Sequence, residues 1–284
     1  MEERNAYTGS LTAIDEPISI EYLTDSGRYT PAHWHEDLEM LYILNGTATV
    51  IADGIRHVLV PGECIVIDSN LLHETQCVTS LMMISVHVKR DYLRSRAGGT
   101  QPFLIRCSRS DLVHEQLKPY LEICDMFRTI VPFYIRQRDG YRLMSEACIL
   151  RILYLLVQHF RIPLGADDIP ALTENRERIQ KIASFIREHY SEKLTLSGTA
   201  EHFGLSEAYF SRLFRKNFGI TFIQHLNRVR IEHIYHDLIA TDEPVMELIE
   251  KHGFTSYKLF SRTFRQIYGC TPREARQRSR SRAE

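Results

Sequence analysis

The sequence predicts an α+β protein of two domains, with a β-rich first half and an all-helical second half. From Ile18 to Val88 short apolar segments alternate with turn signals, a pattern typical of a sandwich or barrel. From Leu196 to Pro272 the chain repeats itself, because Phe210–Arg215 returns as Phe260–Arg265 fifty residues later. A length of 284 residues also favours two domains over one.

Charge is divided unevenly along the chain, although the net charge is only −1. From Glu174 to the end there are 19 Lys and Arg against 14 Asp and Glu, and before it 16 against 22. Hydrophobic residues make up 44% and charged residues 25%, as in ordinary globular proteins. An acidic first half and a basic second half fit a sensor joined to a nucleic-acid binder.

Cysteine usage and hydropathy bear on the compartment. The six cysteines form no CxxC pair and suggest neither a disulfide framework nor a zinc finger. The first ten residues are polar, without the apolar core of a signal peptide. The longest apolar run, Ile149–Val157, is interrupted by Arg151 and is too short to span a bilayer. We therefore expect a reduced, cytoplasmic protein with no membrane partner.

In the first half, apolar alternation and hairpin dipeptides define the expected strands. Asn45-Gly46 and Asp53-Gly54 are strong hairpin-turn signals, because both residues tolerate positive φ. The expected strands are Ile18–Tyr22, Thr47–Ala52, Arg56–Val60, Cys64–Ile67 and Met82–Val88.

One group of polar residues in this half is a candidate ligand site. His33 and His35 lie two residues apart and would share one face of a strand, while Trp34 between them would pack on the other face. Glu39 and His73 are candidates to join them. The four side chains either line a polar pocket without metal or supply three imidazoles and one carboxylate to a divalent transition metal.

The middle of the chain is predicted to be helical. Residues Asp111–Phe127 and Asp139–Phe160 carry apolar residues at spacings of three and four. The second helix is apolar on two sides, so it is either buried in its own domain or shared with a second copy in a homodimer. Residues 161–173 contain prolines and a glycine without an apolar period and are read as a linker.

The repeat in the second half predicts two reading helices. Helix Glu174–Tyr190 comes first, and Ser206 is a good N-cap for the first reading helix. Apolar residues at i, i+3, i+4 and i+8 put Phe210 and Phe214 in the core. Arg and Ser on the opposite face can bond base edges, and Ala can touch a thymine methyl. The candidate DNA contacts of this helix are Ser206, Glu207, Ala208, Ser211, Arg212, Arg215 and Lys216.

The second reading helix has a different exposed face. Phe222–Ile239 is expected to be one long connector helix that holds the two readers in successive turns of one DNA face. The residues assigned to base edges are Ser211, Arg212, Ser261 and Arg262, helped by Ala208, Tyr257 and Lys258, and those assigned to phosphates are Arg215, Lys216 and Arg265. The basic tail Arg273–Arg282 is expected to be frayed. The candidate contacts of the second helix are Ser256, Tyr257, Lys258, Ser261, Arg262 and Arg265.

Residues Glu174 to Arg276 resemble the DNA-binding domain of the AraC family of bacterial transcription regulators. The sequence departs from the family at Ile234 and Ile249, where smaller residues are usual. The matching segments are Ala200, Gly204-Leu205-Ser206, Phe210–Arg215, Gly219-Ile220-Thr221, Arg228-Val229-Arg230, Gly253-Phe254, Phe260–Arg265 and Gly269-Cys270-Thr271-Pro272.

The first half resembles the cupin-like effector domain that many members of this family carry. The spacing of Gly27, His33, His35, Glu39 and Gly46 and the later Gly62 and His73 match the two cupin motifs. Asp68, Asn70 and Cys77 stand where the second motif usually has Pro, Gly and Asn.

Together these resemblances imply a regulator rather than an enzyme. They imply a cupin-like effector and dimerisation domain (1–160), a linker (161–173) and a double helix-turn-helix domain (174–284). The implied partners are double-stranded DNA, a sugar or related metabolite as effector, a second copy of the chain and RNA polymerase. No cofactor is required, and the resemblance leaves open whether the barrel binds a divalent metal.

The alternative is a metal-dependent cupin enzyme, a dioxygenase or isomerase. It would need a bound metal with an open coordination position at the His33, His35, Glu39 and His73 cluster. A sensor needs only a barrel mouth with a few convergent polar groups.

Overall fold

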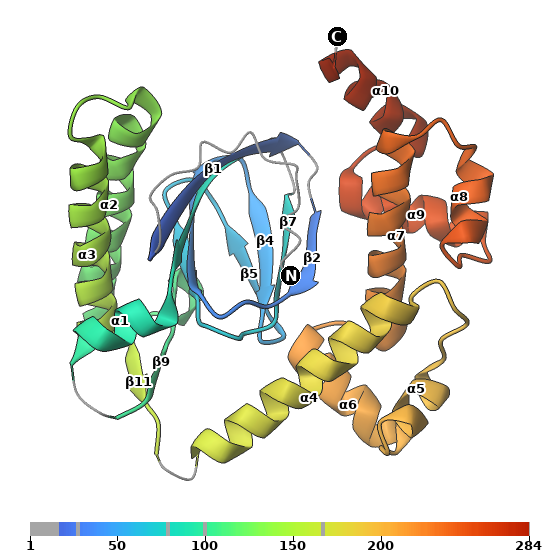
Figure 1. Ribbon diagram of the computed structural model, residues 1–284, viewed down its shortest axis with the longest axis horizontal. Coiled ribbons are helices and arrows are strands. Elements are labelled where there is room, and N and C mark those ends of the chain that lie inside the picture. The colour runs from blue at the N-terminus through green and yellow to red at the C-terminus, as the bar shows by residue number, and fades with distance from the viewer. Residues whose placement is uncertain (1–16, 27–28, 78–79, 99–100, 166–167, 284) are drawn as a thin grey trace.

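The computed structural model describes residues 17–26, 29–77, 80–98, 101–165 and 168–283. Gly27 of the predicted motif and the first sixteen residues lie outside this range. Two antiparallel sheets form a sandwich in the first half (Figure 1). One sheet has the order β1 (Ile18–Ser26), β8 (Ser80–Val88), β3 (Leu38–Asn45), β6 (Cys64–Ile67), β10 (Cys107–Ser108), and the other β2 (Tyr29–His33), β7 (His73–Cys77), β4 (Ala48–Ala52), β5 (Ile55–Leu59).

Apolar side chains from the two sheets meet inside the sandwich. Ile43 and Met83 from the five-stranded sheet lie in one buried cluster with Val50 and Leu59 from the four-stranded sheet. The predicted strands are confirmed. Their alternating pattern has a physical reason, because one face of each strand in a sandwich is buried. The turn between β4 and β5 is built by Asp53-Gly54, with φ of 51° and 73°.

Helices cover the outer face of the five-stranded sheet. They are α1 (Arg90–Ala97), α2 (Leu117–Arg136) and α3 (Tyr141–His159), and α2 and α3 form the layer at the left of Figure 1. The Phe127 ring of α2 stacks on Tyr42 of β3 at 5.1 Å between centroids. The predicted helix Asp111–Phe127 was placed too early: two 3-10 turns, Arg109–Asp111 and His114–Gln116, precede α2. Pro119 then falls in the first turn of α2, where proline removes no needed hydrogen bond.

The apolar stripe of α3 divides into a buried and an exposed part. Ile149 and Ile152 are fully buried against α2 and the sheet. Leu143 is 75% exposed and Tyr154 53%, and Leu150 lies beside them on the open side. The helix is therefore partly core and partly an uncovered apolar surface.

The predicted linker is more ordered than expected. Residues Arg161–Pro163 form strand β11, which pairs with β9 (Phe103–Ile105). Helix α4 runs from Asp168 to His189 and so begins six residues before the predicted start at Glu174. Asp168 lies in its first turn and accepts a hydrogen bond from the Gly165 N–H at 2.9 Å, which starts the helix early.

The second half is helical throughout, with two helix-turn-helix units joined by one helix. Helix α7 packs its first half, including Phe222 and Leu226, into the core of the first unit. Its second half, including Ile234 and Leu238, belongs to the core of the second unit. The helices after α4 are α5 (Leu196–His202), α6 (Glu207–Phe218), α7 (Phe222–Ala240), α8 (Val245–Lys251), α9 (Tyr257–Tyr268) and α10 (Pro272–Ala283).

The basic tail was expected to be frayed, but it forms a helix. Helix α10 covers it, starting at Pro272, a favourable first helical position. Arg276 anchors this helix by donating to the carbonyl oxygens of Leu238 (2.9 Å) and Glu243 (2.6 Å) at the end of α7 and beyond. Because of these hydrogen bonds, the charged tail forms a docked helix and does not fray.

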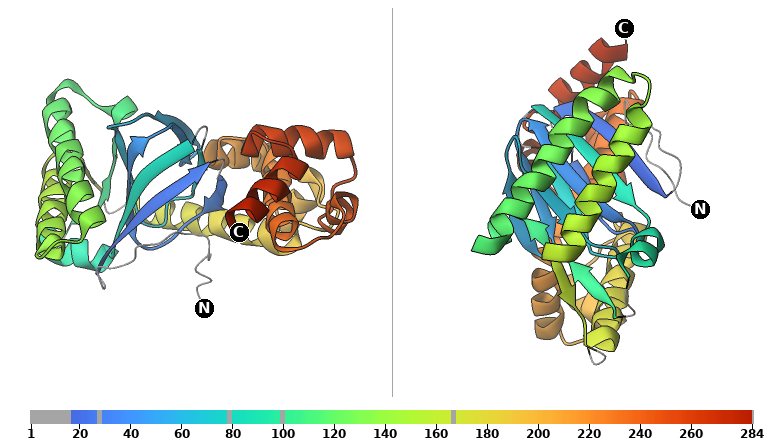
Figure 2. Two further views of the ribbon diagram at one scale, coloured as in Figure 1. Left: turned by 90° about the horizontal axis from the view of Figure 1, so that it is seen from above. Right: turned by 90° about the vertical axis from the view of Figure 1, so that its left-hand side faces the viewer.

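Seen from a second direction, the sandwich lies between α2 and α3 on one side and the helix-turn-helix units on the other (Figure 2). Among the described residues, no helix has the length and apolar character needed to cross a bilayer.

Candidate functional site

A cluster of four histidines and one glutamate lies inside the sandwich near the ends of β2 and β7. His33 ends β2 and is paired in register with His73, which begins β7. Glu39 on β3 is paired with His87 on β8. His35 comes from the loop between β2 and β3, because the strand ends at His33 and does not continue through His35 as predicted.

The side chains of this histidine cluster converge on the Glu39 carboxylate. Its Oε2 lies 3.0 Å from Nε2 of His73 and 3.4 Å from Nε2 of His35. Its Oε1 accepts a hydrogen bond from Ser85 Oγ at 2.9 Å and lies 3.7 Å from Nε2 of His87. The His33 and His73 rings are 4.1 Å apart between centroids. The sequence therefore identified four of these residues correctly as neighbours and missed His87.

The orientation of the rings suits a cation. Nδ1 of His33, His35 and His73 each lies 2.8–3.0 Å from a backbone carbonyl oxygen, of Pro31, Asp37 and Leu71. A carbonyl only accepts, so Nδ1 carries the proton and Nε2 is left with its lone pair. Within the described part of the chain, Nε2 of His35, Nε2 of His73 and Oε2 of Glu39 are buried without a hydrogen-bond partner. In metal-ligating histidines, one ring N–H is typically bound by a carbonyl or carboxylate oxygen, and the other ring nitrogen points at the metal. The rings of this cluster are arranged in the same way.

Two overlapping sets of donors could hold a divalent transition metal. The ligand atoms of His33, His35 and His73 lie within 4.8 Å of one another, and so do those of His35, Glu39 and His87. Imidazole and carboxylate suit Zn²⁺, Fe²⁺, Ni²⁺ or Cu²⁺. The residues present therefore fit a divalent transition metal.

The charges of the cluster are set by burial and by Glu39. Burial, reinforced by His73, lowers the pKa of His33 to about 3, so this ring is neutral. Burial opposes ionisation of Glu39, but the surrounding histidines outweigh it and hold the pKa of this carboxyl well below its usual range. For His35 the effect of burial is outweighed by Glu39, which raises the pKa of the imidazole. The ionised Glu39 carboxylate and the neutral His33 ring can both offer lone pairs to a cation.

The residues that depart from the cupin pattern build the adjoining loop. Asp68 is buried, forms an ion pair with Arg90 and accepts the Ile105 N–H at 3.2 Å. Asn70 has φ of 58°, a left-handed conformation that Asn tolerates better than most residues. The loop that places His73 is thus held by a different set of contacts.

The first reading helix, α6, presents the predicted polar face to solvent. Ser206 caps it by accepting the Tyr209 N–H at 3.3 Å, and Gly219 ends it with φ of 68°. Phe210 and Phe214 are fully buried on the inner side. The candidate contacts Glu207, Ala208, Ser211, Arg212, Arg215 and Lys216 are all exposed.

The second reading helix, α9, repeats this construction. Ser256 accepts the Leu259 N–H at 3.3 Å, so its hydroxyl caps the helix, as Ser206 does in α6. Gly269 ends the helix with φ of 67°, and Phe260 and Phe264 are buried. Ser256 and Ser261 are half-buried, whereas Tyr257, Lys258, Arg262 and Arg265 are exposed.

The basic side chains of both reading faces have no ion-pair partner among the described residues. Elsewhere in these units arginines are committed, such as Arg178 to Glu174 and Arg280 to Asp242. An arginine with five free donors is available to a phosphate or a guanine.

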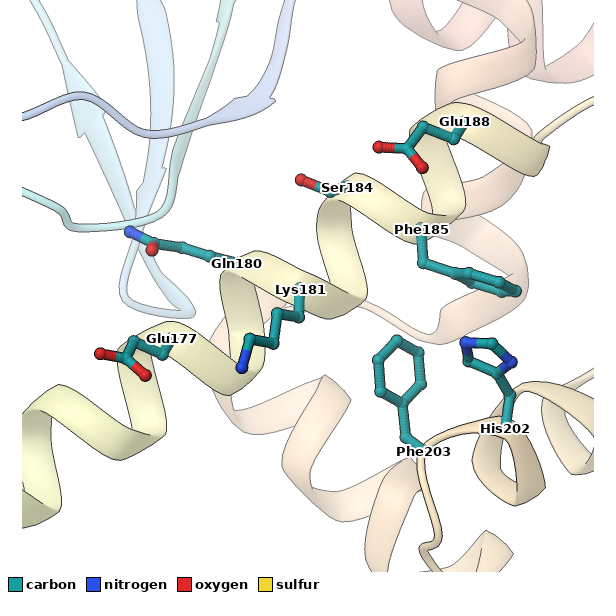
Figure 3. Close-up of a pocket in the computed structure, with 8 residues that line it drawn as sticks. All are labelled: Glu177, Gln180, Lys181, Ser184, Phe185, Glu188, His202 and Phe203. Carbon is teal, nitrogen blue, oxygen red and sulfur yellow. The ribbon is translucent and has the colours of Figure 1, made fainter.

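A groove of about 460 Å³ lies elsewhere, on the outside of the first unit between α4 and α5 (Figure 3). Phe185 stacks on His202 at 4.2 Å and meets Phe203 edge-on at 5.6 Å. These rings pack α5 against α4. The other lining residues are Glu177, Gln180, Lys181, Ser184 and Glu188, on α4. Nothing in this groove converges as the histidine cluster does.

Comparison with known proteins matches both halves of the chain. Residues 21–87 match the cupin domain and residues 199–278 match a helix-turn-helix domain, so the matches fall on the sandwich and on the repeat. The transcriptional activator RhaS of Salmonella paratyphi B is 23% identical over 266 residues, which is 92% of either chain. The chain belongs to the AraC family of transcriptional regulators.

Other relatives share part of this AraC-family chain. An uncharacterised helix-turn-helix regulator of Staphylococcus aureus is 28% identical over 155 residues, 55% of this chain. The chain spans about a fifth of the length of that relative. The C-terminal domain of AraT from Geobacillus stearothermophilus is 31% identical, with a TM-score of 0.33 over 35% of this chain and 84% of its own. ToxT from Vibrio cholerae is 13% identical, with a TM-score of 0.41 over 91% of this chain and 96% of its own.

These relatives are transcriptional regulators and not enzymes. The alternative of a metal-dependent cupin enzyme therefore has no support from the AraC family. The double helix-turn-helix and the cupin-like sandwich that the sequence predicted are confirmed.

Proposed function

We propose that this chain binds double-stranded DNA through α6 and α9 and regulates transcription in response to a ligand in the sandwich. The observation that carries the proposal is the pair of capped helices whose exposed faces bear unpaired arginines. Bases are contacted by exposed residues in the N-terminal half of a recognition helix, where Ala208, Ser211 and Arg212 lie on one helix and Tyr257, Lys258 and Arg262 on the other. Because the two sets differ, we expect two different half-sites.

A selection experiment tests this proposal. The full chain would be used to enrich binding sites from random double-stranded DNA at a fixed salt concentration. We expect a bipartite, non-palindromic site whose half-site centres lie about 10 base pairs apart, one turn of the DNA. Enrichment of no sequence over the starting library would contradict specific DNA binding.

We further propose that the histidine cluster is the effector site and that a divalent transition metal ion fits it. Unpartnered Nε2 and Oε2 atoms favour an ion over the sugar or related metabolite implied by the resemblance, because a hydroxyl-rich ligand needs donors as well as acceptors. The sugar remains a prediction that a ligand screen by thermal shift would check. RNA polymerase remains an expected partner.

Removal of one metal-ligating side chain is expected to weaken metal binding strongly. The wild-type chain, stripped of metal by a chelator, should bind Zn²⁺ with a stoichiometry of about one. His73→Ala should weaken binding by about 100-fold or more, since a ligating side chain matters at least as much as its outer partners. Calorimetric titration with Zn²⁺ measures both the stoichiometry and the affinity. His114→Ala, at an exposed histidine outside the cluster, is the control and should change nothing. Equal affinities for both variants would contradict the site.

We also propose that the exposed stripe of α3 pairs two copies of the chain. Leu143, Leu150 and Tyr154 form an uncovered apolar surface, of a kind that marks protein interfaces. An isologous contact of two such helices would close a two-fold dimer.

A charge in this stripe is expected to separate the dimer. Leu143→Glu would place a carboxylate at the contact, and the weight-average mass in sedimentation equilibrium should fall towards that of one chain. Val58→Glu, on β5 at another solvent-exposed apolar site (Val58 is 55% exposed), should leave the mass unchanged. A wild-type chain that stays monomeric at every concentration would overturn the dimer proposal.

A further inference from the structure

The helix-turn-helix pair is held against the sandwich by a buried polar contact. Glu74 on β7 is only 4% exposed. Its carboxylate accepts a hydrogen bond from the Tyr29 hydroxyl of β2 at 2.8 Å and forms an ion pair with Arg228 of α7. The Arg228 guanidinium also lies 5.8 Å from the centre of the Tyr29 ring. A buried charge needs such partners, so loss of Arg228 would leave the charge of Glu74 uncompensated.

Further contacts on the same sheet face reach both helix-turn-helix units. Arg187 of α4, in the first unit, donates to the Ala32 carbonyl oxygen of β2 at 2.8 Å. Gln76 of β7 donates to the Gln266 carbonyl oxygen of α9, in the second unit, at 2.9 Å. Ala32 and Leu72 are buried in the apolar core of the first unit. The outer face of β2 and β7 therefore holds both units at once.

The hairpin turn between β4 and β5 touches the end of the first reading helix. A Cβ added to Gly54 would lie 1.9 Å from the Lys216 carbonyl oxygen, and one added to Gly219 would lie 2.8 Å from the Gly54 carbonyl oxygen. Two glycines face each other because no side chain fits between the two backbones. The C-terminal ends of both reading helices thus lie against the sandwich, while their reading faces stay open.

The histidine cluster lies on the other side of the same two strands. His73 directly precedes Glu74, and His33 directly follows Ala32. Successive side chains of a strand point to opposite faces, so the two histidines face inward where Glu74 and Ala32 face the helices. Any displacement of β2 or β7 on binding a ligand is carried to the docked helices without an intervening element.

We propose that Glu74, Tyr29 and Arg228, together with the Gly54–Gly219 contact, form a latch that docks the helix-turn-helix pair on the sandwich and couples it to occupancy of the histidine cluster. The coupling part rests on the proposed effector site. The acidic first half and the basic second half favour the same docking. The latch leaves the reading residues exposed and fixes where the two reading helices end.

Glycine variants test the docking by steric means. Gly54→Ala should push the two bodies apart, so small-angle X-ray scattering of the full chain should give a larger radius of gyration. Gly62→Ala is the matched control: Gly62 also has positive φ, 87°, in a turn of the sandwich, but an added Cβ meets no atom within 4 Å. The strain in the backbone is thus shared by both variants and the steric clash is not. Equal radii for the wild type and both variants would overturn the docking contact.

A charge variant supports the same test if Gly54→Ala fails to fold. Arg228→Met should also enlarge the radius, and Glu74→Gln combined with Arg228→Met should add little to either alone, because both remove one interaction. Arg151→Met is the control, since it breaks an exposed ion pair with Glu122 between α2 and α3. An enlarged radius for Arg151→Met as well would overturn a role specific to the latch.

Zn²⁺ titration of the same variants tests the coupling. Thermodynamic linkage is reciprocal: if metal binding at the histidine cluster changes the docking equilibrium, then loss of a docking contact must change the affinity of the cluster for metal. Arg228→Met should therefore change the Zn²⁺ dissociation constant by about 5-fold or more. Arg151→Met should not. Unchanged affinity in Arg228→Met would overturn the coupling while leaving the metal site intact. Absence of Zn²⁺ binding by the wild type would overturn the effector site and the coupling together, and the scattering result would decide the docking.

Discussion

Phe214→Ala is expected to lower the free energy of unfolding by about 3–5 kcal/mol. Phe214 is fully buried in the first helix-turn-helix unit and stacks on Phe218 at 3.9 Å between ring centroids. Phe210 and Phe222 lie within 5.8 Å of it, so little can collapse into the space that the ring leaves. Urea unfolding followed by tryptophan fluorescence measures the loss, because Trp34, the single tryptophan, packs against this same core.

A neighbouring aromatic residue provides the control. Tyr209 precedes Phe210 on the same helix but is 40% exposed. Tyr209→Ala should therefore change stability by less than about 0.5 kcal/mol. A loss of less than about 1 kcal/mol in Phe214→Ala would contradict the close packing of this core.

Arg212→Ala is expected to weaken binding to the selected DNA site by about 1–3 kcal/mol, roughly 5- to 150-fold. Arg212 is exposed in the middle of α6 and has no ion-pair partner among the described residues, so its donors are free for a guanine. The preference at one base position should flatten in a repeated selection. Affinity for unrelated DNA should change much less.

Arg215→Ala is the matched comparison on the same helix. Arg215 is expected to contact phosphate, so its loss should weaken all sequences alike and reduce the salt dependence by about one ion. If Arg212→Ala behaved in the same way as Arg215→Ala, the assignment of Arg212 to base edges would be wrong.

The parts of the fold set by short-range patterns were predictable. Both reading helices could be located from the repeated segment and its aromatic spacing, and the first also from its capping serine, Ser206. The strands followed from alternation and from hairpin dipeptides. Errors fell where tertiary contacts decide: α10 is held by the contacts of Arg276 with carbonyl oxygens 33 and 38 residues away.

The candidate site was predictable only within its motif. His33, His35, Glu39 and His73 follow a recognisable spacing, whereas His87 joins them because β8 is the neighbour of β3 in the sheet. The order of strands is not written in any local pattern. Glu74 and Arg228 are 154 residues apart, and each alone looks like an ordinary surface charge in the sequence.

Helix α7 fixes the position of one reading helix relative to the other. Its two halves are built into two different cores, so neither reading helix can turn without the other. One residue added to an α-helix rotates everything beyond it by about 100° and advances it by about 1.5 Å. A single insertion in α7 would therefore aim the second reading helix away from the groove entered by the first. In the proposed DNA complex, the length of α7 would therefore set the spacing between the two half-sites.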